Sequence, residues 1–445
     1  MQGCILYVPI ARKTFDMEAA EAQYEASLTW LNSLDTPVIA PGQIMTSPED
    51  LTTFLEEVNP STIHTVIYQS ITFADGEFVV KLLEAVDAPF IVWSVREPSV
   101  GGRLRLNSLT GGNSTCHVLH DQKRPFSFLL GNPDEERLRA EVERLLRVNA
   151  MKYTLQHSTI GIVGDHPPGF FFSQAKEAHL QEAFGMRLKT FDIDEAFEKC
   201  VHLPEEEWRP AVKQAEQSVI GLNPNDHAVK RFAQFYTYMN KEVHRHQVAA
   251  LAMRCWPDFF EQLQAAPCST LSHFTEQGVV ASCEADIHGS LSMFILREMS
   301  GGQAPYLGDL VHVVPERNAA VFWHCGAGAY SLATPETGAT VGVHPNRKLG
   351  FALDFSLKPG AVTVFRVSYT QEGYRLLIMK GEALPNGATF QGTSVEVAFS
   401  KDIEELVTCL LTEGYEPHYA MVYGDVTGEL LQLGKELGIP TTIYE

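Results

Sequence analysis

Short apolar runs alternate with segments of helical spacing along the first part of the chain, and this alternation constrains the fold more than any other feature. The apolar, β-branched runs predict strands at 5–8, 38–40, 65–68 and 90–93, and the segments between them predict helices at 17–31, 48–58 and 77–86. Strands and helices that alternate in this way form βαβ units around a parallel sheet. The N-terminal part is therefore predicted to be a Rossmann-like α/β domain.

The remainder of the chain changes character twice. A charged helix from about 133 to 151 leads to a second α/β unit that opens at 159–164, with later helices at 204–219 and 225–253. From about residue 305 the pattern predicts strands at 310–314, 320–324, 361–368, 374–379 and 394–398, then helices at 402–411 and 427–437 and a strand at 441–444. We therefore predict two Rossmann-like parallel-sheet domains, 1–155 and 156–304, followed by a β-rich, barrel-like domain at 305–445.

The segment after the predicted strand at 90–93 is rich in glycine and amide residues. It contains Gly101-Gly102, Asn107-Ser108 and Gly111-Gly112-Asn113, but no GxGxxG pattern, so no dinucleotide site is predicted. Ligands of open parallel sheets bind at the carboxyl ends of the strands. The segment is interpreted either as a binding loop or as a plain flexible connection.

Composition excludes some classes of partner. The chain has 34 Lys+Arg against 55 Asp+Glu, which gives a net charge of −21 without a compensating basic stripe. Nucleic acid and an anionic membrane surface are therefore not expected as partners. No apolar run is long enough to span a membrane, and the eight cysteines are scattered without a CxxC pair. These features predict a soluble, cytoplasmic protein with free thiols.

Acidic side chains stand among apolar ones in Cys283-Glu284-Ala285-Asp286, and Asp309 follows 25 positions after Glu284. A carboxylate in apolar surroundings is costly unless it is paired or coordinates an ion. Two such carboxylates indicate either a hard divalent cation or an acid/base pair. His418 is the best third member and His324 a fourth, although sixteen histidines allow many chance groupings. Asp286 and His288 are interpreted either as residues that orient Glu284 or as part of a helix cap.

Several segments resemble the L-fucose/L-arabinose isomerase superfamily, most strongly over residues 249–326. They are 249–257, Cys268, 283–289, Gly308-Asp309, 323–326, 358–363 and His418. The resemblance implies two Rossmann-like domains before a β-rich domain. It also implies a Mn²⁺-dependent aldose–ketose isomerase that acts on a hexose or pentose through an enediolate, as a homotrimer or homohexamer with active sites near subunit boundaries.

The resemblance also assigns roles. Glu284 and Asp309 match two metal-binding carboxylates that are also the acid/base pair, and His418 matches the late histidine ligand. His324 matches a ligand of the arabinose branch alone. The second carboxylate is an aspartate, as in the fucose branch, and the chain is shorter than typical members of either branch. The sugar is therefore left open.

Further residues are candidates for binding the sugar. Trp93, Asn107 and Asn113 are expected to line the site of a neighbouring subunit, and Trp323 to stack on the sugar ring or pack in the core. Four arginines either bind an anionic C6 substituent or are ordinary surface residues: Arg347, Arg103, Arg105 and Arg297. The superfamily includes isomerases of sulfonated sugars such as sulfoquinovose, which fits an anionic hexose. The alternative is a sugar-binding protein without catalysis.

Overall fold

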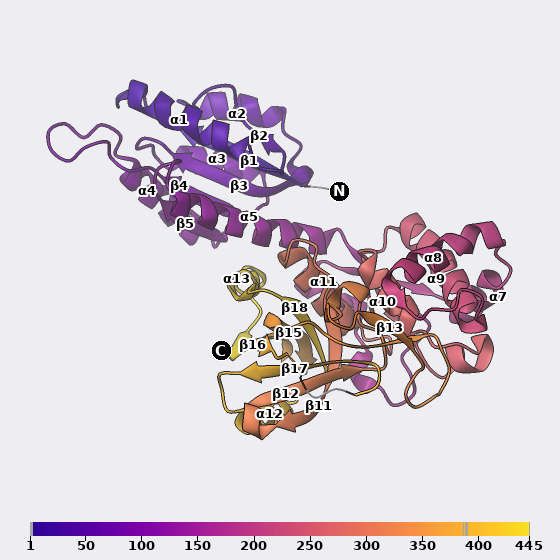
Figure 1. Cartoon of the computed structure of the whole chain (residues 1–445). Helices are drawn as coiled ribbons and strands as arrows, with labels where there is room; N and C mark the ends of the chain where they lie inside the picture. The colour runs from indigo at the N-terminus through magenta and orange to yellow at the C-terminus, as the bar shows by residue number, and fades with distance from the viewer. Residues whose placement is uncertain (1–2, 386, 388–389, 445) are drawn as a thin grey trace. The chain divides into compact units, whose positions relative to one another are not determined.

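The computed structural model describes residues 3–385, 387 and 390–444, which form two compact units, 1–154 and 155–445 (Figure 1). Each unit is described by itself. The three predicted domain ranges stay predictions. No helix among the described residues is long and apolar enough to cross a membrane.

Unit 1 contains a five-stranded parallel sheet with helices packed on both faces. Its strands lie in the order β2-β1-β3-β4-β5. The two faces belong to different cores, because Ile5 and Tyr7 of β1 pack in one and Leu6 and Val8 in the other. The elements are β1 Cys4–Ile10, α1 Met17–Leu31, β2 Val38–Ile39, α2 Pro48–Glu56, β3 Ile63–Ser70, α3 Glu77–Ala85, β4 Phe90–Ser94, α4 Ser108–Asp121, β5 Phe126–Leu130 and α5 Glu136–Gln156.

The glycine- and amide-rich segment of unit 1 is only partly a loop. Helix α4 begins at Ser108 and includes Gly111 and Gly112, so the interpretation of this part as a loop is wrong. A Cβ at Gly112 would lie 2.2 Å from Ser94 Oγ, and one at Gly111 would lie 2.2 Å from Ser70 Oγ. The two glycines therefore let α4 approach the sheet closely, which local sequence preference does not reveal.

Unit 2 contains a four-stranded parallel sheet in the order β10-β9-β6-β7. The predicted helix 225–253 is wrong at its end: α9 stops at His246, and Ala250–Met253 form strand β9 inside the sheet. A short apolar run of this kind suits a central strand as well as a helix. The elements are β6 Thr159–Val163, α6 Glu177–Phe184, β7 Arg187–Phe191, α7 Ile193–Cys200, α8 Glu205–Ser218, β8 Val219–Ile220, α9 His227–His246, β9 Ala250–Met253, α10 Cys268–Glu276, β10 Val280–Ser282 and α11 Ile287–Met299.

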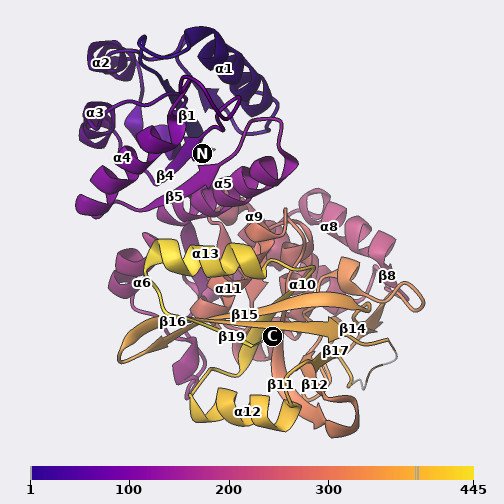
Figure 2. The same ribbon diagram turned by 90° about the vertical axis from the view of Figure 1, so that its left-hand side faces the viewer.

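Unit 2 also contains the predicted barrel. Six strands in the order β16-β15-β18-β11-β12-β17 close on themselves through a β16–β17 pairing. Strands β14, β13 and β8 extend this sheet, β19 pairs with β16, and α12 and α13 lie on opposite sides (Figure 2). The elements are β11 Tyr306–Val314, β12 Ala319–His324, β13 Ala339–Gly342, β14 Ala352–Ser356, β15 Gly360–Thr370, β16 Gly373–Ala383, β17 Thr393–Phe399, α12 Ile403–Thr412, β18 His418–Tyr423, α13 Thr427–Leu437 and β19 Thr441–Tyr444.

One hydrophobic core joins the four-stranded sheet of unit 2 to the barrel. Leu251 of β9 and Cys283, next to β10, belong to the same buried cluster as Tyr306 of β11 and Tyr419 of β18. The carboxyl ends of β9 and β10 are therefore packed toward barrel strands. The predicted fold class, parallel-sheet α/β parts followed by a barrel, is confirmed.

Candidate active site

Glu284 lies in the turn between β10 and the buried helix α11. Both Glu284 (φ 59°) and Ala285 (φ 51°) adopt the left-handed backbone conformation. This conformation costs a non-glycine residue about 1–2 kcal/mol. The turn is held by the Ala285 amide, which donates to Met253 O of β9 at 3.0 Å, and by Asp286, which caps α11 by accepting from the Gly289 amide at 2.9 Å. Strained backbone that is fixed this firmly is typical of functional sites.

Asp309 and His418 come together because their strands are neighbours in the barrel. They are direct partners in the antiparallel pairing of β11 with β18. On its other side β11 pairs with β12, where Asp309 is opposite Trp323 and His324 follows at the strand end. Opposed residues of an antiparallel pair have closely spaced side chains. Asp309 and His418 are 109 positions apart along the chain, but the pairing of their strands brings them side by side.

One imidazole nitrogen and two carboxylates converge at this place. His418 Nε2 lies 3.2 Å from Glu284 Oε2 and 3.4 Å from Asp309 Oδ1. Neither contact is a hydrogen bond, and among the described residues this buried nitrogen has no hydrogen-bond partner. An unpartnered nitrogen that faces two carboxylate oxygens is an arrangement that a divalent cation satisfies.

A buried ion-pair network holds His418 through its other ring nitrogen, Nδ1. Its Nδ1 lies 2.9 Å from Asp286 Oδ2, and a carboxylate at this distance accepts a proton from the ring nitrogen. Arg366, on β15, donates to both Asp286 oxygens at 2.6 and 3.2 Å and lies 3.5 Å from Glu416. Arg366, Asp286 and His418 are fully buried. A carboxylate–histidine pair of this kind orients a metal-ligating histidine and makes it more basic.

The electrostatics of the group favour proton transfer and cation binding. Burial opposes a charge on His418, but the hydrogen bond to Asp286 and the neighbouring Glu284 outweigh it and raise the pKa of His418 to about 10. Burial also raises the pKa of Asp309, partly offset by His418 and His324. The pKa of Asp286 is lowered despite its burial, chiefly by the Arg366 guanidinium. Asp286 is thus ionised, whereas Asp309 is poised to exchange a proton.

His324 adjoins the same group. Asp309, His324 and His418 each offer one ligand atom, and these atoms lie within 4.8 Å of one another. With Glu284 beside His418, the donors are hard carboxylates and imidazoles, which suit Mn²⁺ and similar divalent ions. The residues present therefore fit the predicted metal.

An aromatic wall borders the group. It runs from Phe172, 5.2 Å from the His418 ring, through Phe170 to Trp256, which packs edge-on to Phe170 at 5.4 Å. The Arg347 guanidinium lies over Trp256 at 5.6 Å. Sequence analysis did not predict a role for either phenylalanine. Their only local signal is the Gly169-Phe170-Phe171-Phe172 run in the loop after β6.

The other predicted arginines are already engaged. Arg105 pairs with Asp16 at 2.7 Å, and Arg103 donates to Thr14 O at 2.9 Å. Arg297 pairs with its neighbour Glu298 at 2.7 Å. Exposed Arg347 has no ion pair with a carboxylate in the described part of the chain. Of the four predicted arginines, it is therefore the one most available to an anion.

The predicted sugar-lining residues lie in varied surroundings. Trp93 is fully buried, its Nε1 donates to Gly131 O at 2.8 Å, and it packs in the core of unit 1, so this environment leaves it no surface for a sugar. Asn107 directly precedes α4 and accepts a hydrogen bond from Thr110, whereas Asn113 is exposed on that helix. Trp323 is half-buried beside His324, and its Nε1 donates to Gln391 O at 2.7 Å.

A cavity of about 500 Å³ opens beside the strained turn. Its lining includes Ala285, His288, Lys176, His179 and Tyr374. His288 Nε2 lies 3.3 Å from the Tyr374 hydroxyl, and burial lowers the pKa of His288 to about 4. His288 is thus a neutral member of this cavity wall. The prediction that His288 orients Glu284 stays a prediction.

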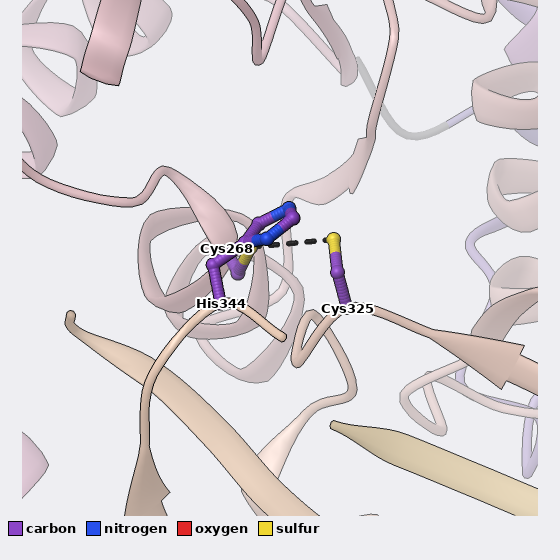
Figure 3. A group of neighbouring side chains, drawn as sticks. All are labelled: Cys268, Cys325 and His344. Carbon is purple, nitrogen blue, oxygen red and sulfur yellow. Dashed lines mark hydrogen bonds between the residues drawn. The ribbon is translucent and has the colours of Figure 1, made fainter. Parts of the chain in front are cut away.

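A cluster of thiols lies behind His324. Cys268 Sγ and Cys325 Sγ are 3.4 Å apart, and His344 completes a group whose ligand atoms lie within 4.8 Å of one another (Figure 3). This group offers the soft donors that a zinc-like ion prefers. However, His344 Nδ1 accepts weak hydrogen bonds from the amides of Asn346 and Arg347, at 3.3 and 3.2 Å. We interpret the group as hydrogen-bonded packing next to His324.

Comparison with known proteins adds close relatives. Sulfoquinovose isomerase from Priestia aryabhattai is 59% identical over 440 residues, with 99% of each chain aligned. The sulfoquinovose isomerases of Alkalicoccus urumqiensis and Clostridium sp. (strain MSTE9) are 51% and 37% identical, again over 99% of each chain. No family model matches the chain. A D-threo-3-hydroxyaspartate dehydratase from Delftia sp. HT23 aligns with a TM-score of 0.14, too low to indicate a shared fold.

Together with these full-length relatives, the barrel and its carboxylate–histidine group define an enzyme of the isomerase class. The chain belongs to the sulfoquinovose isomerase family. The predictions of an isomerase and of a sulfoquinovose-like branch are confirmed, and the alternative of a non-catalytic sugar-binding protein is not favoured. The likeness to the wider L-fucose/L-arabinose superfamily continues to rest on the motifs.

Proposed function

We propose that this enzyme is a divalent-metal-dependent aldose–ketose isomerase that converts sulfoquinovose to the corresponding 2-ketose. The observation that carries the proposal is the convergence of His418 Nε2 with Glu284 and Asp309, at 3.2 and 3.4 Å. The substrate is the one that the names of the three relatives give, at 37–59% identity over nearly the whole chain.

Glu284 and Asp309 are proposed as both the metal ligands and the acid/base pair. Isomerisation moves one proton between C1 and C2 and another between O1 and O2, so two groups that accept and return protons are required. The raised pKa of half-buried Asp309 favours its protonated form during such an exchange. Glu284 extends from a strained, firmly held turn, which limits its movement during transfer.

His418, Glu284 and Asp309 are proposed to hold the cation, and Mn²⁺ is the expected ion. The prediction that His324 is a fourth ligand stays a prediction. When bound there, such an ion would polarise the sugar carbonyl and stabilise the developing enediolate. The residues themselves support its binding. Asp286 keeps the Nδ1 proton of His418, so Nε2 is the ring nitrogen that remains to bind a cation between the two carboxylates.

Arg347 is proposed to bind the C6 sulfonate. It lies over Trp256 and Phe260, at 5.6 and 5.7 Å, so its charge is held on a rigid aromatic surface. The aromatic wall connects it with His418. The arginine guanidinium can donate two parallel charge-assisted hydrogen bonds, which suits a pair of anionic oxygens such as two of the three on a sulfonate. Asn107, Asn113 and Trp323 stay candidate sugar contacts.

The test of the reaction uses the manganese-loaded protein with sulfoquinovose, glucose and a 6-deoxyhexose, and NMR to detect ketose. We expect ketose from sulfoquinovose and loss of turnover after chelation, restored by Mn²⁺. Glu284→Gln should lower kcat by about 100- to 10,000-fold, the usual share of acid/base catalysis. Glu261→Gln, at an exposed position, is the matched control. Turnover that survives complete metal removal, or a fully active Glu284→Gln enzyme, contradicts the proposal.

The sulfonate assignment is tested separately. Arg347→Gln should raise KM for sulfoquinovose by about 10- to 100-fold, since a charged hydrogen bond contributes about 1.5–3 kcal/mol. Any slow conversion of glucose should be unaffected. Arg297→Gln, which removes an arginine already paired with Glu298, is the control. An equal loss for sulfonated and neutral sugars would place the sulfonate elsewhere. The expected homotrimer or homohexamer is tested by analytical ultracentrifugation.

A further inference from the structure

The two histidines of the site are held by opposite kinds of neighbour. His418 presents Nδ1 to the Asp286 carboxylate at 2.9 Å, and because a carboxylate can only accept, Nδ1 carries the proton. His324 presents Nδ1 to the Cys325 backbone amide, which donates to it at 2.9 Å. Because an amide can only donate here, Nδ1 of His324 carries the lone pair. A neutral His324 ring therefore has its proton on Nε2.

The protonated nitrogen of His324 faces the reacting groups. His324 is 4% exposed, and among the described residues its Nε2 has no hydrogen-bond partner. The rings of His324 and His418 are 5.7 Å apart, and His324 offers a nitrogen within 4.8 Å of ligand atoms of Asp309 and His418. Since Nδ1 is occupied at Cys325, we assign this position to Nε2. A buried N–H without a partner is costly unless a ligand accepts from it.

The surroundings keep the ring in this orientation. Cys325 Sγ lies 3.2 Å from the same Nδ1 and 3.4 Å from Cys268 Sγ, so sulfur atoms fill the space behind the ring. Trp323 lies nearly parallel to His324 at 6.4 Å. The backbone is closed by the Gly326 amide, which donates to His324 O at 2.8 Å. A proton on Nδ1 would meet the amide hydrogen of Cys325, which disfavours the other tautomer.

We propose that His324 is a catalytic hydrogen-bond donor that lies beside the metal ligands and is not one of them. Its Nε2–H donates to the sugar oxygen on which negative charge develops as C1 and C2 exchange a proton. A neutral imidazole can polarise a carbonyl in this way, and a preorganised donor stabilises charge that forms in the transition state. No proton leaves the ring in this role. The inference rests on the proposed isomerase reaction and assigns the chemistry of one residue within it.

The first test counts imidazole ligands. Mn²⁺ binding and nitrogen hyperfine couplings are measured by pulsed EPR for the wild type, His324→Gln and His418→Gln, without sugar. We expect one imidazole coupling in the wild type, retained in His324→Gln and lost in His418→Gln. The Mn²⁺ Kd should change less than about threefold in His324→Gln and rise about 10-fold or more in His418→Gln. Two couplings in the wild type, one of them lost in His324→Gln, would overturn the proposal.

The second test measures how the loss of the hydrogen-bond donor changes kcat. A glutamine amide can place an N–H near the position of Nε2, whereas leucine cannot. His324→Leu should lower kcat by about 100- to 1,000-fold, as removal of an oxyanion donor does, and His324→Gln should recover at least about one tenth of the activity. His202→Gln, at an exposed position, is the histidine control and should match the wild type. Equal losses in the leucine and glutamine variants would overturn the donor role.

The third test is independent of metal and sugar. Ring ¹⁵N NMR of the metal-free, histidine-labelled protein assigns the His324 signals by their absence in His324→Gln. The proposal requires a protonated Nε2 and an unprotonated Nδ1. A proton on Nδ1, shared with a Cys325 thiolate, would refute it even if the isomerase reaction is established. Conversely, the expected tautomer in a protein that does not isomerise sulfoquinovose would refute the proposed function alone.

Discussion

Both units of this protein contain a parallel sheet, but the charged side chains beside the two sheets differ in how deeply they are buried. In unit 1 the ion pairs that involve Arg12, Arg96 and Arg105 are between partly exposed side chains. Its buried polar groups, such as Tyr7 and Gln69, are neutral and hydrogen-bonded to each other. In unit 2 buried charges meet one another where the sheet packs on the barrel. The comparison shows that the parallel sheet of unit 2 does not form the candidate site alone. The sheet side supplies Glu284, and the barrel supplies Asp309 and His418 opposite it.

The largest expected effect comes from breaking the buried pair of unit 2. Asp286→Asn leaves the Arg366 charge buried and weakens the hold on His418. We expect the unfolding free energy of unit 2 to fall by about 3–5 kcal/mol. The Mn²⁺ affinity should fall by about 10- to 100-fold. Asp16→Asn, which breaks the exposed pair with Arg105 in unit 1, should change neither quantity noticeably. Urea unfolding measures the free energy of unfolding, and titration measures the Mn²⁺ affinity. Similar losses in Asp286→Asn and Asp16→Asn would contradict the expected difference between the two units.

Two glycines offer clashes of similar size in the two units. A Cβ at Gly289 would lie 2.4 Å from Asp286 Oδ2, and one at Gly112 would lie 2.2 Å from Ser94 Oγ. Each alanine substitution should destabilise its own unit by about 1–3 kcal/mol, as overpacking does. Only Gly289→Ala should also weaken Mn²⁺ binding, because it displaces the carboxylate behind His418. Metal binding that is unchanged in Gly289→Ala would argue against the orienting role of Asp286.

Acid should weaken both units, and unit 2 more steeply. Burial lowers the pKa of His64 in unit 1, and of His273 and His288 in unit 2, to about 4, from an ordinary value of 6.5. The unfolded chain therefore binds protons that the folded chain excludes. The contribution of these three histidines to stability is complete above pH 6.5 and falls toward pH 4, by about 1.4 kcal/mol per pH unit for each histidine.

Hydrogen exchange on peptides from each unit measures this pH dependence. His64→Gln should flatten the decline in unit 1 while leaving that of unit 2 unchanged. A decline that is equally steep in the wild type and in His64→Gln would assign the acid sensitivity of unit 1 to other groups.

The smallest expected effect concerns backbone strain. Ala285→Gly should stabilise unit 2 by up to about 1 kcal/mol, since glycine adopts a positive φ without steric penalty. Asn107 in unit 1 also has a positive φ (54°), but asparagine tolerates this conformation, so Asn107→Gly should change stability less. Thermal unfolding compares the two variants. A destabilised Ala285→Gly protein would show that the turn is not strained.

Local patterns predicted most elements of unit 1 and of the barrel, although not strand β5, because apolar periodicity is decided by neighbouring residues. Helix α1 has the bounds that its spacing predicts, and most barrel strands lie within a few residues of their predicted ranges. Strand β18 was not predicted, since its buried run begins with polar His418 directly after Pro417. Helix α4 was not predicted because it contains Gly111 and Gly112, which are poor helix formers but allow the helix to pack closely on the sheet.

The candidate site was predictable in its membership but not in its geometry. Residue types and motif resemblance identified Glu284, Asp309 and His418, but the pairing of Asp309 with His418 depends on barrel register, which no local window encodes. Arg366 was missed, although an arginine within the apolar run Val364-Phe365-Arg366-Val367 signals a buried charge that needs a partner. The tautomers of the two histidines follow only from atoms that the fold brings together.

The position of β11 between β12 and β18 has a consequence for protein synthesis. Glu284 and Asp309 leave the ribosome well before His418, which completes the donor group from a strand on the far side of β11. Contacts this distant in sequence form late. A nascent chain therefore presents the two carboxylates without His418. Under the proposed ligand assignment, a metal ion can be selected only after translation has passed residue 418.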